Sequence, residues 1–460
     1  MMIPQVLDKQ RFYFAGVAGA GMSAIAQYLS GSGKTVLGSD RLFNGNEHTH
    51  IRQQLIAANI ICYDQQQAHI TADDEVLVVS TAIEASNPEV AKAQELNIPI
   101  ITRAQLLAQI CAQKQTIAVA GTSGKSSTAA MLFHLMSNCG IDASLITGAG
   151  IITLIQQGKI GNCHVGQSDW LIIEADESDG SLVQYEATIG LLLNVDKDHK
   201  ELDELNDIFN TFRQKTRQTF IVNQSHPIAK TFSTQQGFDF GVGTSLDGED
   251  FEQKGFNITF KVQGISFSIP LIGQHNMENA LATLAVAKVV GIELRAAAEA
   301  LRSYPGIYRR HQLLGKVKGI TVIDDYAHNP AKIAASIRAC KPVAAKLIAW
   351  FQPHGYAPTR FIRKELVEEI CAALQANDEI WMSEIYYAGG TTVKDISAGD
   401  IINDLKQNGM NAYFVPDRQQ LLTEMLPHFT DDCVLLLMGA RDPSLEDFGK
   451  DLYEELKTRI

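Results

Sequence analysis

A lysine follows a glycine-rich turn in Ala120-Gly-Thr-Ser-Gly-Lys-Ser-Ser127, between an apolar strand pattern and a helical pattern. Glycine lets backbone N–H groups approach a phosphate without a Cβ clash, and the N-terminus of the next helix adds the positive end of its dipole. Lys125 can reach the β- and γ-phosphates of a nucleotide, and the Ser126 hydroxyl can bind Mg²⁺. A strict P-loop has glycine where this chain has Val119, so an ordinary glycine-rich turn is the alternative. We predict a nucleotide-binding loop formed by Gly121, Thr122, Ser123, Gly124, Lys125, Ser126 and Ser127.

Two apolar strand patterns end in acidic residues. Trp170–Glu174 ends in a glutamate, and Leu191–His199 continues into an acidic loop with a histidine. The carboxyl ends of parallel strands meet at one edge of a sheet, so both loops should open beside the nucleotide-binding loop. Oxygen and imidazole ligands there could hold a metal ion, and we favour this role for Glu174 because it lies at the strand end. For the acids that follow, solvated loop carboxylates are the better interpretation: Asp176, Glu177 and Asp179.

A second glycine-rich turn, Gly16-Val-Ala-Gly-Ala-Gly21, follows the first apolar strand pattern. It nearly fits the G-x-G-x-x-G pattern of dinucleotide-binding turns, with Ala18 in place of the second glycine. Asp40 lies at the end of the next strand pattern, where a partner of a ribose hydroxyl is expected. The motif is weak alone, because any Rossmann-like domain that binds a nucleotide diphosphate can use such a turn. A cluster of packing glycines is the alternative.

The elements that position these residues alternate between short apolar runs and longer helical patterns, which is typical of βαβ units and parallel sheets. Each glycine-rich turn restarts a strand–turn–helix pattern, and 460 residues predict roughly three domains at about 150 residues each. We therefore expect an α/β fold. Its three domains are a Rossmann-like domain at 1–109, a P-loop domain at 110–313 with a parallel sheet and a β-rich flank between Phe220 and Gly273, and a second Rossmann-like domain at 314–460. The expected strands are Arg11–Ala15, Thr35–Gly38, Glu75–Ser80, Gln115–Ala120, Trp170–Glu174, Gly190–Asn194, Ile320–Ile323, Lys346–Phe351, Glu379–Met382, Ala412–Val415 and Cys433–Met438.

Composition limits the partners and the compartment. The chain has 39 Lys and Arg against 52 Asp and Glu, a net charge of −13, which argues against nucleic acid because phosphate backbones require a basic face. Seven cysteines without C-x-x-C spacing argue against a disulfide framework or structural zinc site and fit a reducing compartment. No signal-peptide pattern is present, and the apolar runs are too short to span a bilayer. We expect a cytoplasmic monomer or homodimer that has no membrane partner.

The motifs together resemble the Mur ligases, the ATP-dependent amide-forming enzymes of peptidoglycan synthesis. Ala120–Ser127 resembles the family's G-T-H-G-K-T-T loop, and Glu174–Asp179 is identical to the E-A-D-E-S-D of the members that add L-alanine. The other matches follow in the family's order over nearly the whole chain: Gly16–Gly21 with Gly38–Asp40, Val79–Ile83 with Asn87–Glu89, Asn194–His199, Gly273–Asn276 with Asn279, Gly306–Arg310, and Asp324–Pro330.

The resemblance implies one domain for each reactant: a UDP-N-acetylmuramate-type substrate in the first, ATP in the second, and an amino acid or short peptide in the third, which closes over the others. It implies Mg²⁺ at Ser126, Glu174 and His199. Beyond the P-loop, the implied ATP-binding residues are His275, Asn276, Asn279, Arg310 and Asp325. The implied UDP-substrate residues are Gly16, Ala18, Gly19, Gly21, Met22, Asp40 and Ser80. The implied amino-acid residues are Tyr326, His328 and Arg360. The implied catalytic residues are Lys125, Glu174, His199, Arg310 and His328.

The implied reaction joins an amino acid, L-alanine in the first place, to the carboxylate of UDP-N-acetylmuramate through an acyl phosphate, giving ADP and phosphate. The family's P-loop has histidine and two threonines where this chain has Ser123, Ser126 and Ser127. The members that add L-alanine have Y-G-H-H-P in the third domain, where this chain reads Tyr326-Ala-His-Asn-Pro330, a form more like that of the members that add later residues of the peptide. The members that add L-alanine also have two arginines, which bind the amino acid, at the positions of Gly355 and Pro358, and the family has a glycine at the position of Arg441. Neither Gly355 nor Pro358 can supply a guanidinium for a carboxylate.

These departures leave the amine open. A Mur-type ligase for another amine, such as the murein tripeptide in peptidoglycan recycling, is the first alternative. An NAD-dependent oxidoreductase that uses Gly16–Gly21 is an alternative from another class, but it accounts for neither the P-loop nor the Glu174 and His199 pair. A non-catalytic UDP-sugar-binding protein is the last, and the constellation of Lys125, Glu174 and His199 argues against it.

Overall fold

The structure is a computed structural model that describes residues 4–45, 49–84, 86–177, 180–196, 201–234, 237–387 and 393–460. The chain divides into two compact units. Unit 1 comprises Met1–Asp250, Phe260–Ser268 and Met277–Ile307, and unit 2 comprises Phe251–Thr259, Ile269–Asn276 and Tyr308–Ile460. Both contain open sheets made mainly of parallel strands together with helices, so the expected α/β fold class is confirmed.

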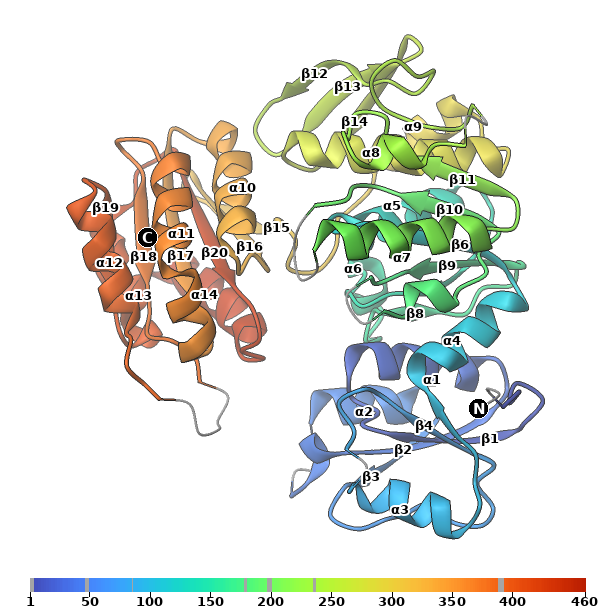
Figure 1. Cartoon of the computed structure of the whole chain (residues 1–460). Coiled ribbons are helices and arrows are strands. Elements are labelled where there is room, and N and C mark those ends of the chain that lie inside the picture. The colour runs from blue at the N-terminus through green and yellow to red at the C-terminus, as the bar shows by residue number, and fades with distance from the viewer. Residues whose placement is uncertain are drawn as a thin grey trace. The chain divides into compact units, whose positions relative to one another are not determined.

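Unit 1 begins with a five-stranded parallel sheet in the order β3-β2-β1-β4-β5 (blue to cyan in Figure 1). Its strands are β1 (Arg11–Ala15), β2 (Thr35–Asp40), β3 (Ile60–Asp64), β4 (Val76–Val79) and β5 (Ile100–Thr102). Its helices are α1 (Ala20–Gly31), α2 (His50–Ala57), α3 (Pro88–Glu95) and α4 (Arg103–Ala112). The strand order changes direction at β1, which pairs with β2 and β4. Open α/β sheets bind ligands beyond the strand ends at such a point, and the turn Gly16–Gly21 follows β1 there.

The second sheet of unit 1 has the order β11-β10-β6-β9-β7-β8. The pairs are parallel except for β7 with β8, which is antiparallel. Its strands are β6 (Gln115–Ala120), β7 (Ser144–Ile146), β8 (Cys163–His164), β9 (Trp170–Glu174), β10 (Ile189–Leu192) and β11 (Thr219–Val222). The helices of this part of the chain are α5 (Lys125–Asn138), α6 (Ile152–Ile155), α7 (Leu202–Lys215), α8 (Gln274–Val289) and α9 (Leu294–Arg302). Strand β6 lies between β10 and β9, so the P-loop that follows it also lies where the strand order changes direction.

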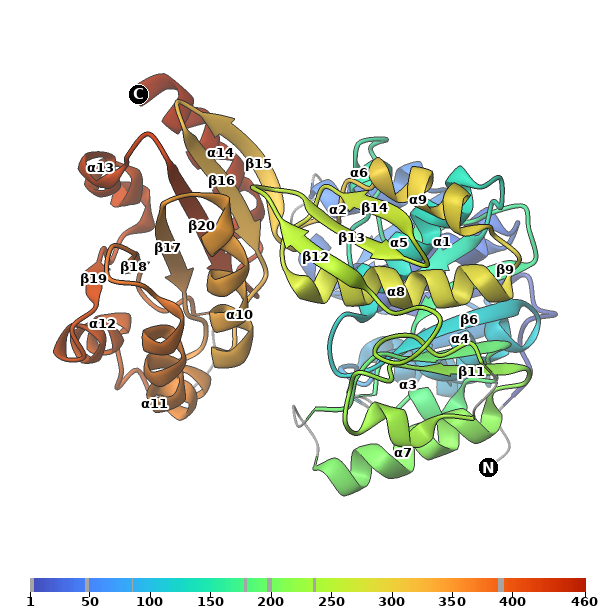
Figure 2. The same ribbon diagram turned by 90° about the horizontal axis from the view of Figure 1, so that it is seen from above.

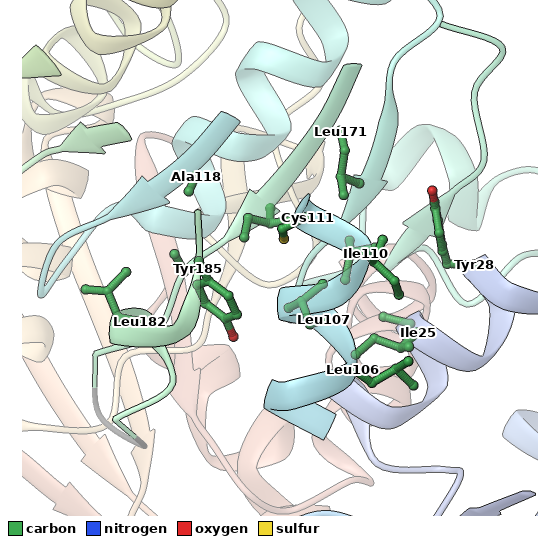
Figure 3. Packing of buried hydrophobic residues seen from close by; sticks show 14 of the residues in the cluster. Ile25, Tyr28, Leu106, Leu107, Ile110, Cys111, Ala118, Leu171, Leu182 and Tyr185 are labelled. Atoms are coloured by element: carbon green, nitrogen blue, oxygen red, sulfur yellow. The ribbon is translucent and has the colours of Figure 1, made fainter. Parts of the chain in front are cut away.

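Helix α4 joins the cores of these two sheets. Thr102 and Gln105 form a capping box at its start, which satisfies backbone N–H groups that the helix leaves unpaired. Its apolar side chains belong to one continuous buried cluster with α1 and with the second sheet. Figure 3 shows Leu106, Leu107, Ile110 and Cys111 of α4 packed between α1, which supplies Ile25 and Tyr28, and the second-sheet part of the unit, which supplies Ala118, Leu171, Leu182 and Tyr185. The two sheets of unit 1 therefore share a core.

The expected β-rich flank is confirmed. Strands β12 (Glu249–Gln253), β13 (Ile258–Val262) and β14 (Ile265–Ile269) form a three-stranded sheet in chain order. Buried and more exposed residues alternate along β13, as expected for a strand with one face on the core. The residues of this sheet fall partly in unit 1 and partly in unit 2.

Unit 2 holds a six-stranded sheet in the order β15-β16-β20-β17-β18-β19. Strand β15 pairs antiparallel with β16, and the other pairs are parallel. The strands are β15 (Gln312–Val317), β16 (Ile320–Asp325), β17 (Lys346–Gln352), β18 (Glu379–Met382), β19 (Asn411–Phe414) and β20 (Cys433–Gly439). The helices are α10 (Pro330–Cys340), α11 (Tyr356–Ala373), α12 (Ala398–Gln407), α13 (Leu421–Met425) and α14 (Leu445–Arg459).

The central strands of unit 2 are buried on both faces. Along β20, Val434, Leu436 and Met438 pack into one apolar cluster, while Cys433, Leu435 and Leu437 pack into another. Helices α10, α11 and α12 cover the first face, and α13 and α14 cover the second (Figure 2). Such strands read as continuous apolar runs, which is why they were visible in the sequence. All seven cysteines are free. Among the described residues, no helix has both the length and the apolar composition needed to cross a membrane.

Candidate active site

The predicted P-loop connects β6 to α5 with two glycines of positive φ, 137° at Gly121 and 83° at Gly124. A side chain would also be crowded by its neighbours at both positions. A Cβ on Gly121 would lie 3.1 Å from the backbone nitrogen of Asn194, and a Cβ on Gly124 would lie 2.7 Å from Asn279 Oδ1. Because α5 begins at Lys125, its first N–H groups have no helical acceptor. The loop therefore has the geometry of an anion-binding turn.

Asn194, which lies just beyond strand β10, holds this loop by hydrogen bonds. Its Oδ1 accepts hydrogen bonds from the Ser123 backbone N–H at 2.8 Å and from the Thr122 hydroxyl at 2.9 Å. Its Nδ2 donates to the Ser123 carbonyl at 3.1 Å. The sequence did not single out Asn194 as a site residue. Its position could have indicated this role, because it lies just beyond β10, whose Leu192 is in register with Ala120 of β6.

Lys125 contacts acidic side chains of the loop after β9. Its Nζ donates to Glu177 Oε2 at 2.7 Å and to the Gly121 carbonyl at 2.7 Å, and it lies 3.7 Å from Asp176 Oδ1. The prediction that Glu177 is a solvated loop carboxylate is wrong, because only 5% of the residue is exposed. Burial raises the pKa of Glu177 above its usual value, although Lys125 acts in the opposite direction. Asp179 lies outside the described residues.

Two of the three predicted metal ligands lie side by side. The Ser126 hydroxyl donates to Glu174 Oε1 at 2.7 Å, and Glu174 Oε2 accepts from the Thr147 hydroxyl at 2.9 Å and the Gly148 N–H at 3.0 Å. The third predicted ligand, His199, lies outside the described residues. Within the described part of the chain, no group of three or more His, Cys, Asp and Glu side chains could hold a metal ion. A hydroxyl beside a carboxylate is nevertheless the type of oxygen donor set that Mg²⁺ prefers, so the residues present fit that ion.

The turn after β1 is pinned by Asp40. Its Oδ2 accepts from the Ala18 N–H at 2.9 Å and its Oδ1 from the Leu42 N–H at 3.0 Å, and the residue is buried. Both carboxylate oxygens therefore hold the backbone of the turn and of the segment after β2. The predicted contact of Asp40 with a ribose stays a prediction. Its structural contacts already explain why an acid stands at the end of β2.

A cavity of about 540 Å³ in unit 1 extends from the glycine-rich turn after β1 to the end of β9. The predicted UDP-substrate residues that line it are Gly16, Gly19, Gly21, Met22, Asp40 and Ser80. From the second sheet it is lined by Glu174, Asp176, Thr147 and Gly148. Arg41, Gln65 and Arg103 also line it and were not predicted. Arg103 lies against the turn, since a Cβ on Gly21 would come within 3.0 Å of its side chain. One cavity thus connects the turn after β1 with Glu174, which accepts the hydrogen bond of Ser126.

Three of the predicted ATP-binding residues, His275, Asn276 and Asn279, share helix α8. Asn279 Oδ1 accepts from Thr128 in α5 at 3.2 Å, directly behind the P-loop. Asn276 is buried and donates to the Ile272 carbonyl at 2.8 Å. The ring of His275 lies 5.6 Å from that of His311, and burial, with His311 adding to it, lowers the pKa of His275 to about 4. The contact of these residues with ATP stays a prediction.

In unit 2, predicted residues gather beyond the carboxyl ends of the central strands. The Arg310 guanidinium lies 5.1 Å from the centre of the Tyr326 ring, and the rings of Tyr326 and His328 lie 5.5 Å apart. His354, which follows β17, lies 5.9 Å from His328, and burial, His328 and Arg441 together lower its pKa to about 4. The structure thus brings Arg310, Tyr326 and His328 together.

Asp325 and Arg360 have partners of their own. Asp325 Oδ1 accepts from the His311 N–H at 3.1 Å. Burial alone would raise the pKa of Asp325, but His311, Arg310 and Ser336 together bring it below its usual value. Arg360 forms an ion pair with Asp395 at the surface of α11. Its predicted contact with the amino acid therefore stays a prediction.

Three family models match most of the chain. The model described as Mur ligase family, catalytic domain, matches residues 11–115; the Mur ligase middle domain matches 119–287; and the Mur ligase, glutamate ligase domain, matches 309–441. A UDP-N-acetylmuramate–L-alanine ligase of Geotalea uraniireducens is 32% identical over 474 residues, which cover 97% of this chain and 98% of that relative. The chain belongs to the Mur ligase family. A relative of the same name from Pelotomaculum thermopropionicum is 30% identical over 473 residues, covering 98% and 99% of the two chains.

Solved structures with the Mur ligase fold match nearly the whole chain. The UDP-N-acetylmuramate-alanine ligase of Thermotoga maritima superposes with a TM-score of 0.80 at 23% identity, covering 98% of this chain and 100% of that one. The murein peptide ligase of Psychrobacter arcticus superposes with a TM-score of 0.65 at 20% identity, with the same coverage. The predicted fold and family are confirmed. The oxidoreductase alternative gains no support from these relatives.

Proposed function

We propose that this Mur ligase joins L-alanine to the carboxylate of UDP-N-acetylmuramate, with ATP converted to ADP and phosphate. The cavity in unit 1 carries the proposal, because it connects the glycine-rich turn after β1 with Glu174 beside the P-loop. A sugar nucleotide held at the turn could extend its carboxylate towards the phosphates of a nucleotide held at the P-loop. The names of the relatives that align over nearly the whole chain give the same reaction.

The first step would transfer the γ-phosphate of ATP to the substrate carboxylate. Both groups are anionic, so the site must offset their repulsion and stabilise the charge of the transition state. Lys125 can do so by exchanging its contacts with Gly121 and Asp176 for phosphate oxygens while Glu177 holds its Nζ nearby. Ser126 and Glu174, with His199 as the third predicted ligand, would hold Mg²⁺, which supplies positive charge to the phosphates. Arg310 is the other cation assigned to the γ-phosphate.

In the second step, an amine attacks the acyl phosphate after losing a proton. We assign this proton to His328 Nε2. His328 Nδ1 lies 2.9 Å from the Tyr326 carbonyl, and a carbonyl can only accept, so Nδ1 carries the hydrogen and Nε2 presents a lone pair. Tyr326 and His328 would face the amine.

The proposal includes the three domains and their roles. Residues 1–109 would bind the UDP-substrate, 110–313 the ATP, and 314–460 the amino acid. The boundary at 109 falls inside α4, the helix that joins the cores of the first two sheets. We also propose that the reaction takes place in the cytoplasm, where seven free thiols and phosphorylated substrates are expected.

The test is an acceptor panel. The full-length chain is mixed with ATP, Mg²⁺ and UDP-N-acetylmuramate, and phosphate release and product mass are followed with L-alanine, D-alanine, glycine, L-serine and murein tripeptide. We expect phosphate release that requires both UDP-N-acetylmuramate and L-alanine. Phosphate release at the same rate with and without UDP-N-acetylmuramate would contradict ligase activity on this substrate. Preference for the tripeptide would instead support a recycling ligase, which Gly355 and Pro358 make the second candidate.

A further inference from the structure

Arg441 lies at the same sheet edge as the proposed amine site. In unit 2, β20 is the neighbour of both β16 and β17, with Met438 in register with Asp325 and Gly439 in register with Gln352. The segments that leave these strands therefore begin side by side. They carry Tyr326 and His328 after β16, His354 after β17, and Arg441 after β20. This arrangement is a consequence of three adjacent parallel strands.

The backbone holds Arg441 in a conformation that favours glycine. Its φ is 61°, the left-handed region, which costs a residue with a Cβ of order 1 kcal/mol. Asp442 holds this turn in place. Its N–H donates to the Ala440 carbonyl at 2.8 Å, and its buried carboxylate pairs with Arg418 at 2.5 Å. Arg441 itself is exposed, so its own packing does not compensate for this conformation. An arginine at a position where glycine would have the lower backbone energy indicates that the arginine side chain has a role.

The charge of Arg441 is also not neutralised by an acidic side chain among the described residues. Other arginines of unit 2 form ion pairs with acids: Arg309 with Asp324, Arg360 with Asp395, Arg363 with Asp404 and Arg418 with Asp442. Arg441 has neither an ion-pair nor a hydrogen-bond partner among the described residues. Its positive charge instead acts on His354, which lies 5.9 Å from His328. A guanidinium without an acidic partner, close enough to His354 to lower its pKa, is a site for an anionic group of a ligand.

The start of α11 offers no alternative cation at this edge. Gly355 has φ 71°, donates its N–H to the Tyr386 carbonyl at 2.8 Å and packs against Pro358. Both residues are uncharged, and the first arginine of the helix, Arg360, is already paired with Asp395. Among the described residues of the segments that leave β16, β17 and β20, Arg441 is therefore the arginine without an acidic partner.

We propose that Arg441 binds the carboxylate of the incoming amino acid and so selects an α-amino acid as the acceptor. This inference rests on the proposed ligase function. In an α-amino acid the amine and the carboxylate share one carbon, so a carboxylate at Arg441 keeps the amine within reach of the neighbouring loop that carries His328. In a peptide the residue with the free amine has its carboxyl group in an amide bond, and it cannot form a bidentate pair with a guanidinium. The site therefore favours alanine over the tripeptide.

Arg441→Gly tests this inference. It removes the guanidinium and places glycine where φ is positive, so we expect a melting temperature equal to or above that of the wild type. The KM for L-alanine should rise about 10- to 100-fold, the scale of a lost hydrogen-bonded charge pair, with the KM for ATP and UDP-N-acetylmuramate unchanged. Arg441→Lys keeps the charge but not the planar guanidinium, so its KM for L-alanine should lie between those of the wild type and of Arg441→Gly. L-Alaninamide supplies a second readout: the wild type should use it far less well than L-alanine, and Arg441→Gly should discriminate little between them.

The matched control is Arg338→Ala, which removes an exposed arginine of α10 that pairs with Glu369 at 3.6 Å. It should leave all three KM values unchanged. An Arg441→Gly enzyme with the wild-type KM for L-alanine would overturn the inference but leave the ligase function standing. A fall in melting temperature with all three KM values raised would also overturn it, by showing a structural role. Absence of alanine-dependent turnover in the wild type would instead count against the proposed function.

Discussion

Lys125 is held by two contacts that bound phosphates would have to replace or share. Its Nζ lies 2.7 Å from both the Gly121 carbonyl and Glu177 Oε2. The carbonyl contact ties the lysine to its own loop, and the carboxylate contact ties it to the segment after β9. Since Glu177 is buried, its attraction for the lysine is weakly screened by solvent. We infer that Glu177 positions Lys125 over the loop and that the lysine delivers its charge to the phosphates.

Lys125→Ala should lower kcat by on the order of 10²-fold or more, because it removes one charge that stabilises the transferred phosphate. The variant should still fold, since the loop is also held by Asn194. Initial rates of phosphate release at saturating substrates measure the effect, and circular dichroism checks the fold. Lys215→Ala, at the exposed end of α7, is the matched control and should behave as wild type. Near-normal turnover of Lys125→Ala would remove the residue from its assigned role.

At the scale of elements, most central strands were predictable and most edge strands were not, although the edge strand β19 was expected at Ala412–Val415 and lies at Asn411–Phe414. Strands β1, β6 and β9 have the expected bounds, and the first two are buried along most of their length. The edge strand β3 has only two buried residues and the edge strand β15 has none, and neither strand was predicted.

The same distinction applies to the candidate site. The pairing of Ser126 with Glu174 could be expected, because both follow neighbouring parallel strands, in register at Val119 and Glu174. The contacts of Asn194 with the P-loop and of Glu177 with Lys125 could not be predicted from the sequence. They depend on how loops fold back over the sheet edge, which spacing along the chain does not encode.

Helix α3 buries a carboxyl group beneath the first sheet, and this gives the first sheet a pH dependence. The Tyr13 hydroxyl in β1 donates to Glu89 Oε1 at 2.8 Å, and burial raises the pKa of Glu89 from 4.5 to about 7. The folded state thus binds more protons than the unfolded state between these values. Its stability falls as the pH rises through that window, by about 3 kcal/mol when complete.

Glu89→Gln should remove this loss while keeping an acceptor for Tyr13. We expect its free energy of unfolding to exceed that of the wild type at pH 8 by up to about 3 kcal/mol, and by much less at pH 5. Urea unfolding at the two pH values measures it. Glu95→Gln, at the exposed end of the same helix, should show no such change between pH 5 and pH 8. A Glu89→Gln effect of equal size at both pH values would refute the explanation.

At the scale of the whole molecule, the shared core of unit 1 predicts that its two parallel sheets unfold together. The α4 side chains shown in Figure 3 contribute to one cluster that contains residues of both sheets. Removing part of a side chain from this helix should therefore weaken two sheets that are distant in sequence. Unit 2 has its own apolar clusters on the two faces of its sheet and should not respond.

Ile110→Ala should lower the stability of unit 1 by about 2–5 kcal/mol, the range for a large-to-small substitution in a core. Hydrogen exchange followed by mass spectrometry should show amide protection lost to a similar degree in peptides from β1 and from β6, and unchanged in peptides from β20. Ile370→Ala, a buried isoleucine of α11 in unit 2, is the matched control and should give the reverse pattern. Loss of protection in β1 alone would mean that the first sheet unfolds independently. The cavity that both sheets line would then depend on docking of separately stable parts, rather than on one cooperative core.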